Sequence, residues 1–555
     1  MKTKLAILVG AALLAMAGLG CERLPMLPTG TPSTTATSRD TVTPLPPTAT
    51  STPTLAPTPL PPTATPTSSP TVSPPTVTPP PTALPTDTPT PDWVDLEAQC
   101  AALASLDCAE VELLSTAPFY EILATVDLSQ PAIEGKQRLR YWNRSTQPLP
   151  EIYFRLYPND ATYGGSLRVT SALADGAPVT PHLSAGDTVL SLPLPRPLPP
   201  GASVDLELAF HTTVPRDSQV HYQIFTYSRE MAALSNFYPA LAVYDDEGWD
   251  LDPILPQGDA AYTEIAFHQV ALIVPVGTVL ATSGTEVGRW DNGDGTATHV
   301  LVSGPGRDFG LALSGRYEMA TRMAGEVAVR SFYLPEDEAA GLKLLGHAAD
   351  ALEILARRFG PYPYNEFDVV QSPIGAGGME LPGMTLIQAE QYGRADGYDE
   401  FLVAHEVAHQ WWYNLVGNDP QEHAWVDEGL TNYSAIVYFE DLQGRSQEGG
   451  TLDWYLRDPY GRLEADQDLP ANLPVDAYVD PIYYRIVYAK AGLFFHELRQ
   501  RLGDAAFFRL LREYADENRY GIVTSEQVLD FWTSRADVDV GDLVERWITT
   551  RPPRP

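Results

Sequence analysis

Apolar and polar positions alternate in short runs from about residue 112 to residue 315. The runs are rich in β-branched and aromatic side chains, and turn residues separate them, which is the pattern of half-buried strands. Clear examples are Arg138–Trp142, Ile152–Leu156 and Val204–Leu208. The pattern predicts an all-β domain, a sandwich or a saddle-like sheet, over residues 112–320.

From about residue 335 the apolar positions recur with the period of a helix instead. Ala339–Phe359 carries apolar side chains along one face, and the Gly-Pro pair that follows it is a stop signal. A strand is expected at Phe367–Gln371. Further helices are expected at Lys490–Leu502, at Ala505–Asn518 and after Thr524, which can form a capping box with Gln527. Residues 321–555 are therefore expected to form a second domain.

The first 21 residues have the pattern of a secretory signal. Lys2 and Lys4 precede an apolar run from Leu5 to about Met16, and small residues precede Cys21. The apolar run is too short for a comfortable transmembrane helix. Residues 18–21 resemble a bacterial lipobox, so we predict that Cys21 is lipidated and anchors the chain to a membrane. A plain signal peptide, with secretion of the protein, is the alternative.

The next segment, residues 22–91, cannot form a packed core. It contains no aromatic residue and holds 21 of the chain's 52 prolines among many threonines. We predict a disordered, extended tether there, followed by a short helical lead-in at residues 92–111. Cys100 and Cys108 lie in this lead-in, where they can form a disulfide on the exported side or remain two buried free thiols.

The charge of the chain argues against a nucleic acid partner. The sequence holds 71 acidic residues against 36 lysines and arginines, a net charge of −35. Phosphate binding requires the opposite sign. Such acidity can steer cationic peptides to a site, but it more often serves solubility.

The sequence from His405 to His409 reads His-Glu-Val-Ala-His, and Glu428 follows after eighteen residues. On a helix, positions i and i+4 share one face, so the imidazoles of His405 and His409 can meet at one point. Glu406 would lie beside them without being a ligand. With Glu428 from a second helix, three ligands and one open position indicate a hydrolytic site with one zinc ion per chain. The structural alternative is a buried core helix with two satisfied histidines. In either case the apolar helix is expected to end near Gly417.

Several further motifs accompany the zinc motif, in an order that resembles the gluzincin aminopeptidases typified by aminopeptidase N and leukotriene hydrolase. They are Tyr238-Pro239, Phe359–Tyr364, Gly377–Glu380, Trp425–Gly429 and Tyr488–Lys490. The resemblance implies a multidomain fold, in which an N-terminal β domain precedes a thermolysin-like α+β zinc metallopeptidase domain.

The chemistry of such a site assigns a role to each motif. Glu406 would take a proton from the attacking water and pass it to the leaving amine. By family position, Tyr488 would stabilise the oxyanion. Tyr483 and Tyr484 are the obvious alternatives for this role.

The same resemblance implies a substrate-binding site around Glu380, which would pair with the α-ammonium of the peptide. Gly377, Gly378 and Met379 would let the substrate backbone approach as an extra strand. Glu230, by rough position, would also help to bind the amine. The sequence departs from the family pattern where Leu381 replaces an asparagine.

These residues predict an aminopeptidase that is held outside the cell and acts on peptides. A zinc endopeptidase with an open cleft is the first alternative, and a non-catalytic peptide-binding lipoprotein is the second. Glu380 discriminates between the first two, because an endopeptidase has no use for an amine anchor.

Overall fold

The computed structural model describes residues 93–550, except for residues 105–107, 221, 395–396 and 444–449. The predicted signal, the lipidation site at Cys21 and the predicted tether lie outside the described residues. Among the described residues, no helix is both long enough and apolar enough to cross a membrane.

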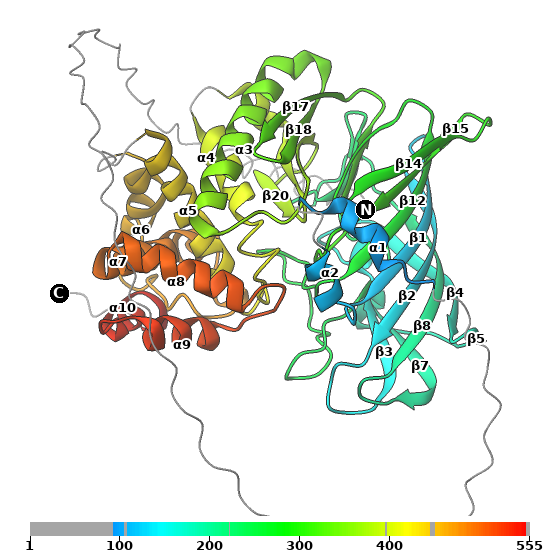
Figure 1. The fold of residues 1–555 in the computed structure, drawn as a ribbon, viewed down its shortest axis with the longest axis horizontal. Helices are drawn as coiled ribbons and strands as arrows, with labels where there is room; N and C mark the ends of the chain where they lie inside the picture. Colours follow the sequence, from blue (N-terminus) through cyan, green and yellow to red (C-terminus); the bar gives the residue numbers. More distant parts are fainter. Residues whose placement is uncertain (1–92, 105–107, 221, 395–396, 444–449, 551–555) are drawn as a thin grey trace, which may run out of the picture. The chain divides into compact units, whose positions relative to one another are not determined.

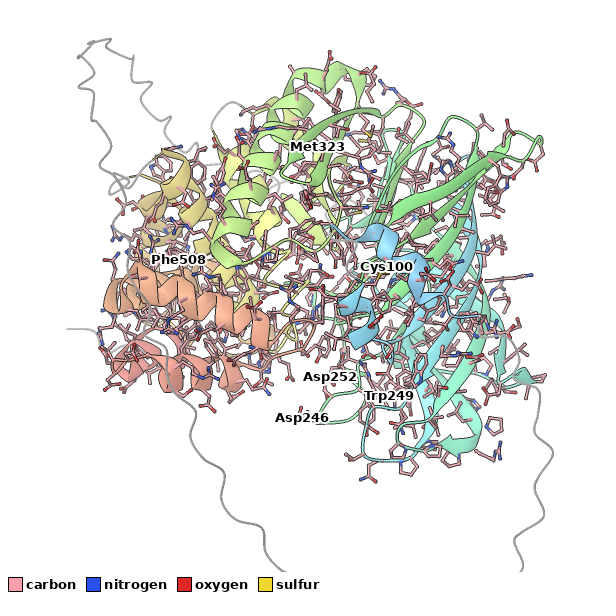
Figure 2. All side chains as sticks on the ribbon, in the orientation of Figure 1. Cys100, Asp246, Trp249, Asp252, Met323 and Phe508 are labelled. Carbon is pink, nitrogen blue, oxygen red and sulfur yellow. A yellow bond between two sulfur atoms is a disulfide. The ribbon has the colours of Figure 1, made fainter. Side chains whose placement is uncertain are left out.

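Short helical segments precede the first strand: α1 (Leu96–Gln99), η1 (Cys100–Ala102) and α2 (Ala109–Leu113). Cys100, which lies beside the β domain in Figure 2, forms a disulfide with Cys108. Of the two alternatives for these cysteines, the structure has the disulfide. The covalent link joins η1 to α2 across the lead-in.

In the residues that the structure describes, the β domain contains three sheets. The largest has eight strands in the order β14-β15-β12-β1-β2-β8-β4-β5. Two four-stranded sheets have the orders β13-β16-β10-β9 and β11-β3-β7-β6. The bounds of the sixteen strands are β1 (Phe119–Asp127), β2 (Ala132–Trp142), β3 (Leu149–Arg155), β4 (Ser166–Ala174), β5 (Ala177–Pro178), β6 (His182–Ser184), β7 (Val189–Leu198), β8 (Ser203–Thr213), β9 (Phe225–Ser228), β10 (Met231–Leu234), β11 (Ala240–Leu241), β12 (Phe267–Pro275), β13 (Val279–Thr282), β14 (Thr285–Asp291), β15 (Thr296–Val302) and β16 (Leu311–Ser314).

Alternation along the strands explains the core of this domain. In β2, Leu139 and Tyr141 are buried, whereas Arg138 and Arg140 point to the other face and pair with Asp205. Inward-facing side chains of this kind from the three sheets form one apolar cluster.

A fourth sheet, of five strands, belongs to the part of the chain that carries the zinc motif. Its order is β17-β18-β19-β21-β20, so β20 is an edge strand. Helix α3 (Glu338–Phe359) packs against β17 and β18. The strands are β17 (Glu318–Ala324), β18 (Val327–Tyr333), β19 (Glu366–Ser372), β20 (Gly378–Leu381) and β21 (Met384–Gln388).

Helices build the rest of this second part, and Figure 1 shows them on the side away from the eight-stranded sheet. The longer ones are α4 (Tyr398–Ala408), α5 (Trp425–Gln443), α7 (Ala491–Leu502), α8 (Asp504–Glu517) and α9 (Ser525–Arg535). Helix α9 begins with the predicted capping box between Thr524 and Gln527. A π-helical segment, η8 (Tyr484–Lys490), leads into α7.

One helix end differs from the expectation. Helix α4 stops at Ala408 with His409 as its C-cap, well before Gly417. The chain then makes a tight turn, in which the amide of Trp411 donates to the carbonyl of Ala408 and that of Asn414 to the carbonyl of His409. The apolar run continues past the helix because these residues remain buried, not because they remain helical.

Candidate functional site

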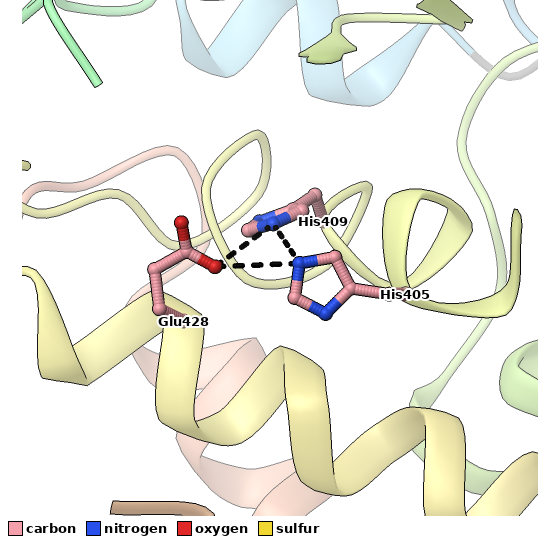
Figure 3. A group of neighbouring side chains, drawn as sticks. All are labelled: His405, His409 and Glu428. Carbon is pink, nitrogen blue, oxygen red and sulfur yellow. Dashed lines mark hydrogen bonds and ion pairs between the residues drawn. The ribbon is translucent and has the colours of Figure 1, made fainter. Parts of the chain in front are cut away.

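Two buried helices bring the three predicted metal ligands together. Helix α4 presents His405, His409 follows as its C-cap, and α5 presents Glu428 from its first turn (Figure 3). His405 Nε2 lies 3.2 Å from His409 Nε2 and 3.3 Å from Glu428 Oε2. His409 Nε2 lies 3.5 Å from the same carboxylate oxygen. The three ligand atoms thus form a nearly equilateral triangle.

This triangle has the size that a tetrahedral zinc ion requires. Ligand bonds of about 2.0–2.1 Å at tetrahedral angles separate the ligand atoms by roughly 3.3–3.4 Å. His409 Nδ1 lies 2.9 Å from the carbonyl oxygen of Trp412. Because a carbonyl only accepts, Nδ1 carries the proton, and the neutral imidazole has its lone pair on Nε2. Among the described residues, the oxygen of Glu428 that faces both histidines has no other hydrogen-bond partner. These residues fit a zinc ion.

Electrostatics keep Glu428 in the form that a ligand needs. Burial alone would raise the pKa of its carboxyl, but the contacts with His405 and His409 lower that pKa to about 2. Burial, together with the nearby Glu380 carboxylate, raises the pKa of Glu406 well above its usual value. The pKa of Glu428 is therefore lowered, as a metal ligand requires, and the pKa of Glu406 is raised, as a proton carrier requires.

A pocket of about 220 Å³ opens beside the triangle and is lined by other predicted residues. Glu406 and Glu380 line it, as do Gly377, Gly378 and Met379. Gly378 is needed for this arrangement, because a Cβ there would lie 2.1 Å from Oε1 of Glu406. Strand β20, which carries Gly378 to Leu381, leaves its outer edge without a neighbouring strand in the five-stranded sheet.

Tyrosines from η8 close the side of the pocket near the triangle. The hydroxyl of Tyr488 donates to Oε1 of Glu428, and its ring stacks near that of His405 with centroids 5.9 Å apart. Tyr484 also lines the pocket, whereas its neighbour Tyr483 packs against Gly258 outside the lining residues. Tyr488 is therefore the tyrosine nearest to the metal ligands.

Comparison with known proteins identifies the part that holds this site. Residues 344–547 match the family model described as Peptidase family M1 domain. This chain carries a peptidase family M1 domain. The resemblance to the aminopeptidase N family is confirmed.

Relatives of the M1 domain include the aminopeptidase N of Lactobacillus helveticus, 26% identical over 26% of this chain and 18% of that protein. Leucine aminopeptidase 2 of Yarrowia lipolytica is 29% identical over 31% of this chain and 28% of its own length. Human aminopeptidase B is 27% identical over 35% of this chain and 32% of its own length. The chain thus spans less than a third of each of these relatives.

Among solved structures, the M1 zinc metallopeptidase of Deinococcus radiodurans superposes with a TM-score of 0.60 at 22% identity, covering 79% of this chain and 94% of that one. A mutant of that enzyme with a bound Tyr-Ser-Ala substrate has a TM-score of 0.59. The predicted fold class, a β domain followed by a metallopeptidase domain, is confirmed. Together with the triangle of ligand atoms, the M1 match also confirms zinc as the cofactor of this site.

The β domain adds residues to the pocket of the M1 domain that sequence reasoning missed. Asp259, Leu255 and Tyr222 line the pocket. Burial raises the pKa of Asp259 well above its usual value, and the charge of Glu380 raises it further. These residues lie in long connections between strands and carry no motif, so only the packing of the two domains reveals them.

Glu230, in contrast, does not reach the pocket. It occupies the turn between β9 and β10 with φ of 63°, and its carboxylate pairs with Arg316 at the surface, 3.4 Å away. Its side chain is 67% exposed, and it is absent from the lining residues. The tight turn directs this side chain outward, so the structure gives no support to its predicted role in binding the amine.

Proposed function

We propose that this chain is a zinc aminopeptidase that releases N-terminal residues from peptides. The observation that carries the proposal is the position of Glu380. This residue is buried, only 6% exposed, in the same small pocket as the ligand triangle and Glu406. A buried carboxylate without a cation is costly, and a peptide α-ammonium would supply that cation.

Asp259 supports an amine-binding role for this end of the pocket. It lies on the β domain, where the charge of Glu380 raises the pKa of Asp259 and a hydrogen bond with Asp259 lowers the pKa of Glu380. Two carboxyl groups in such contact hold a proton between them, and a bound cation can take the place of that proton. The pocket is also smaller than the roughly 300–1,000 Å³ of ordinary small-molecule sites, as suits a subsite for one terminal residue.

The remaining residues supply the chemistry of hydrolysis. When bound, zinc acts as a Lewis acid and lowers the pKa of water at the site. Glu406 accepts a proton from the attacking water and delivers it to the leaving amine, for which its raised pKa is suited. Tyr488 donates its hydroxyl proton in a hydrogen bond to the scissile carbonyl oxygen as negative charge develops there.

The proposal also includes a place of action outside the cell. A lipid on Cys21 and the Pro/Thr-rich segment that follows would hold the enzyme at a membrane, with secretion as the alternative. Mass spectrometry of the mature N-terminus tests this part: a diacylated Cys21 supports anchoring, whereas an unmodified N-terminus near Cys21 supports secretion.

Aminoacyl-anilides and their N-acetylated forms test the activity. We expect the wild type to cleave the free-amine substrates and largely ignore the blocked ones. Loss of the charge-assisted contact is worth about 1.5–3 kcal/mol, or roughly 10–150-fold in kcat/KM. Glu380→Ala should lose a similar factor on free-amine substrates, and it should narrow the difference between free and blocked substrates because both changes delete one contact.

Glu390→Ala is the matched control. Glu390 follows strand β21 and pairs at the surface with Arg229, outside the pocket. This variant should keep the wild-type ratio between free and blocked substrates. If the wild type cuts blocked peptides at internal bonds as fast as free ones, the protein is an endopeptidase and the proposal is wrong.

A further inference from the structure

The turn after the zinc helix contains a backbone conformation that side-chain-bearing residues rarely adopt. Tyr413 has φ of 132°. The amide of Tyr413 donates to the carbonyl of Val416 at 2.9 Å, and this bond closes the turn. Such conformations persist only where surrounding contacts hold them. The contacts of Tyr413 therefore show what keeps the turn in this conformation.

This conformation directly affects a metal ligand. The φ angle of Tyr413 orients the peptide group between Trp412 and Tyr413, and the oxygen of that group accepts the hydrogen bond from Nδ1 of His409 at 2.9 Å. That bond sets which nitrogen of His409 carries the proton and how the ring is oriented. The turn thus fixes the imidazole that faces Glu428.

A single arginine of the β domain holds the other side of Tyr413. Arg307 lies between β15 and β16, is 4% exposed, and donates from Nε to the carbonyl of Tyr413. Its other nitrogens donate to the carbonyls of Thr263, at 3.2 Å, and Gly521. The guanidinium thus joins three separate segments.

The chain is shaped to accept this guanidinium. A Cβ on Gly417 would lie 2.2 Å from Cζ of Arg307, so only glycine fits there. The segment that carries Arg307 is itself fixed by Asp308, whose carboxylate accepts from Tyr238 and from Asn236, each at 2.9 Å. Within the described residues, the hydrogen-bond partners of Arg307 are backbone carbonyls. A buried cation with only such partners is costly, which indicates that its position matters.

We propose that Arg307 is a positioning residue for the zinc site: it holds the strained Tyr413 turn, whose Trp412 carbonyl orients His409. Without the bond from Nε, Tyr413 can relax toward a negative φ, and the Trp412 carbonyl then rotates away from His409. Lysine can replace Arg307 only in part, because one ammonium cannot reach three carbonyls with the geometry of the planar guanidinium.

Zinc binding by the full chain tests this inference, which rests on the zinc site of the proposed function. We expect Arg307→Met to weaken zinc binding by about 10-fold or more, as the loss of an outer hydrogen bond to a ligand typically does. The dissociation constant is measured by competition with a chromogenic chelator. The electronic spectrum of the cobalt-substituted protein should also shift, because it reports ligand geometry.

Gly417→Ala provides a second, independent perturbation. It keeps Arg307 but fills the space that the guanidinium occupies, so we expect the same loss of zinc affinity and the same spectral shift. If Arg307→Met does not fold, Gly417→Ala and Arg307→Lys carry the test, and Arg307→Lys should show the weaker zinc binding of a partial replacement.

Arg155→Met is the matched control. Arg155 is a buried arginine of the β domain that also donates to a backbone carbonyl, that of Asp252 at 2.7 Å, but it lies outside the zinc pocket. It should lose thermal stability and keep zinc affinity. Unchanged zinc affinity and cobalt spectrum in folded variants at Arg307 and Gly417 would overturn the inference. If the wild type binds no zinc, the zinc site itself is wrong and the proposed function fails first.

Discussion

At the scale of single residues, Glu406 can be separated from the metal ligands by experiment. Its side chain lies in the pocket, with one carboxylate oxygen lacking any hydrogen-bond partner among the described residues. Glu406→Gln keeps the shape but removes the proton acceptor. We expect zinc content to stay near one per chain and kcat to fall by roughly 10²–10⁴-fold.

Elemental analysis and steady-state kinetics check this expectation together. Glu428→Ala is the contrasting variant, because it removes a ligand and should lose zinc along with activity. A Glu406→Gln enzyme with nearly normal kcat would show that another residue carries the proton.

Tyr488 is expected to act on the transition state. Tyr488→Phe removes only a hydroxyl, so KM should change little while kcat falls by roughly 10²–10³-fold. Tyr484→Phe is the matched control, since Tyr484 lines the same pocket on the preceding turn of η8. Initial rates of hydrolysis of one anilide over a range of concentrations give kcat and KM for both variants. A large loss in Tyr484→Phe and none in Tyr488→Phe would transfer the role to Tyr484.

The sequence predicted those site residues whose positions follow from local spacing. His405, Glu406 and His409 share one helix end, so their geometry is set within a few residues. Asp259 and Arg307 could not be predicted in this way, because each reaches the site through contacts between domains. Glu230 shows the reverse error. Its role in binding the amine was predicted from its rough position in the family pattern, but it lies in a turn that directs its side chain to solvent.

At the scale of secondary structure, long periodic segments were predicted well and their ends less well. Helix α3 begins at Glu338, one residue before the predicted Ala339. Helix α4, by contrast, ends at Ala408 although the apolar run continues to Trp412, because burial alone does not distinguish a helix from a tight turn in the core. The turn at Tyr413 follows from packing against Arg307, which no local pattern encodes.

The capping box of α9 gives a test of stability at this scale. Thr524 Oγ1 accepts from the amide of Gln527, and the side chain of Gln527 accepts from the amide of Thr524 at 3.0 Å. Thr524→Ala removes a hydrogen-bond acceptor from the helix start and should lower the free energy of unfolding by about 1 kcal/mol.

Urea denaturation followed by circular dichroism measures this change. Thr524→Ser retains the hydroxyl and should stay close to the wild type, while both variants should keep zinc. Equal loss in the serine and alanine variants would mean that the threonine methyl, and not the cap, stabilises the helix.

At the scale of the whole molecule, the β domain does more than support the M1 domain. It supplies Asp259 to the pocket and Arg307 to the turn behind His409. Both domains also line a second cleft, of about 890 Å³. Its acidic side chains include Asp246 and Asp252, from the loop after β11 (Figure 2), and Glu422 of the M1 domain. The pocket is thus a product of two domains, and the contacts between them should control substrate binding.

Gln421 of the M1 domain makes two of these contacts. Its Oε1 accepts from the amide of Leu255 at 2.8 Å, and its Nε2 donates to the carbonyl of Asp259 at 2.9 Å. One side chain therefore holds two points, Leu255 and Asp259, of the β-domain connection that lines the pocket. Gln421→Ala should let this loop move and so weaken the contact between Asp259 and the substrate amine.

We expect Gln421→Ala to raise KM for free-amine substrates by several-fold, up to about 10-fold, since two ordinary hydrogen bonds are each worth about 0.5–1.5 kcal/mol. The values of kcat and zinc affinity should change little, because the ligands and Glu406 are untouched. Gln219→Ala is the control. Within the part of the chain that the structure describes, the Gln219 side chain bonds to the nearby carbonyls of Asp217 and Ser218, so its loss should leave KM unchanged. If Gln421→Ala instead lowers kcat and zinc affinity with KM unchanged, the loop supports the metal site and not the amine, and the role proposed for Asp259 must be abandoned.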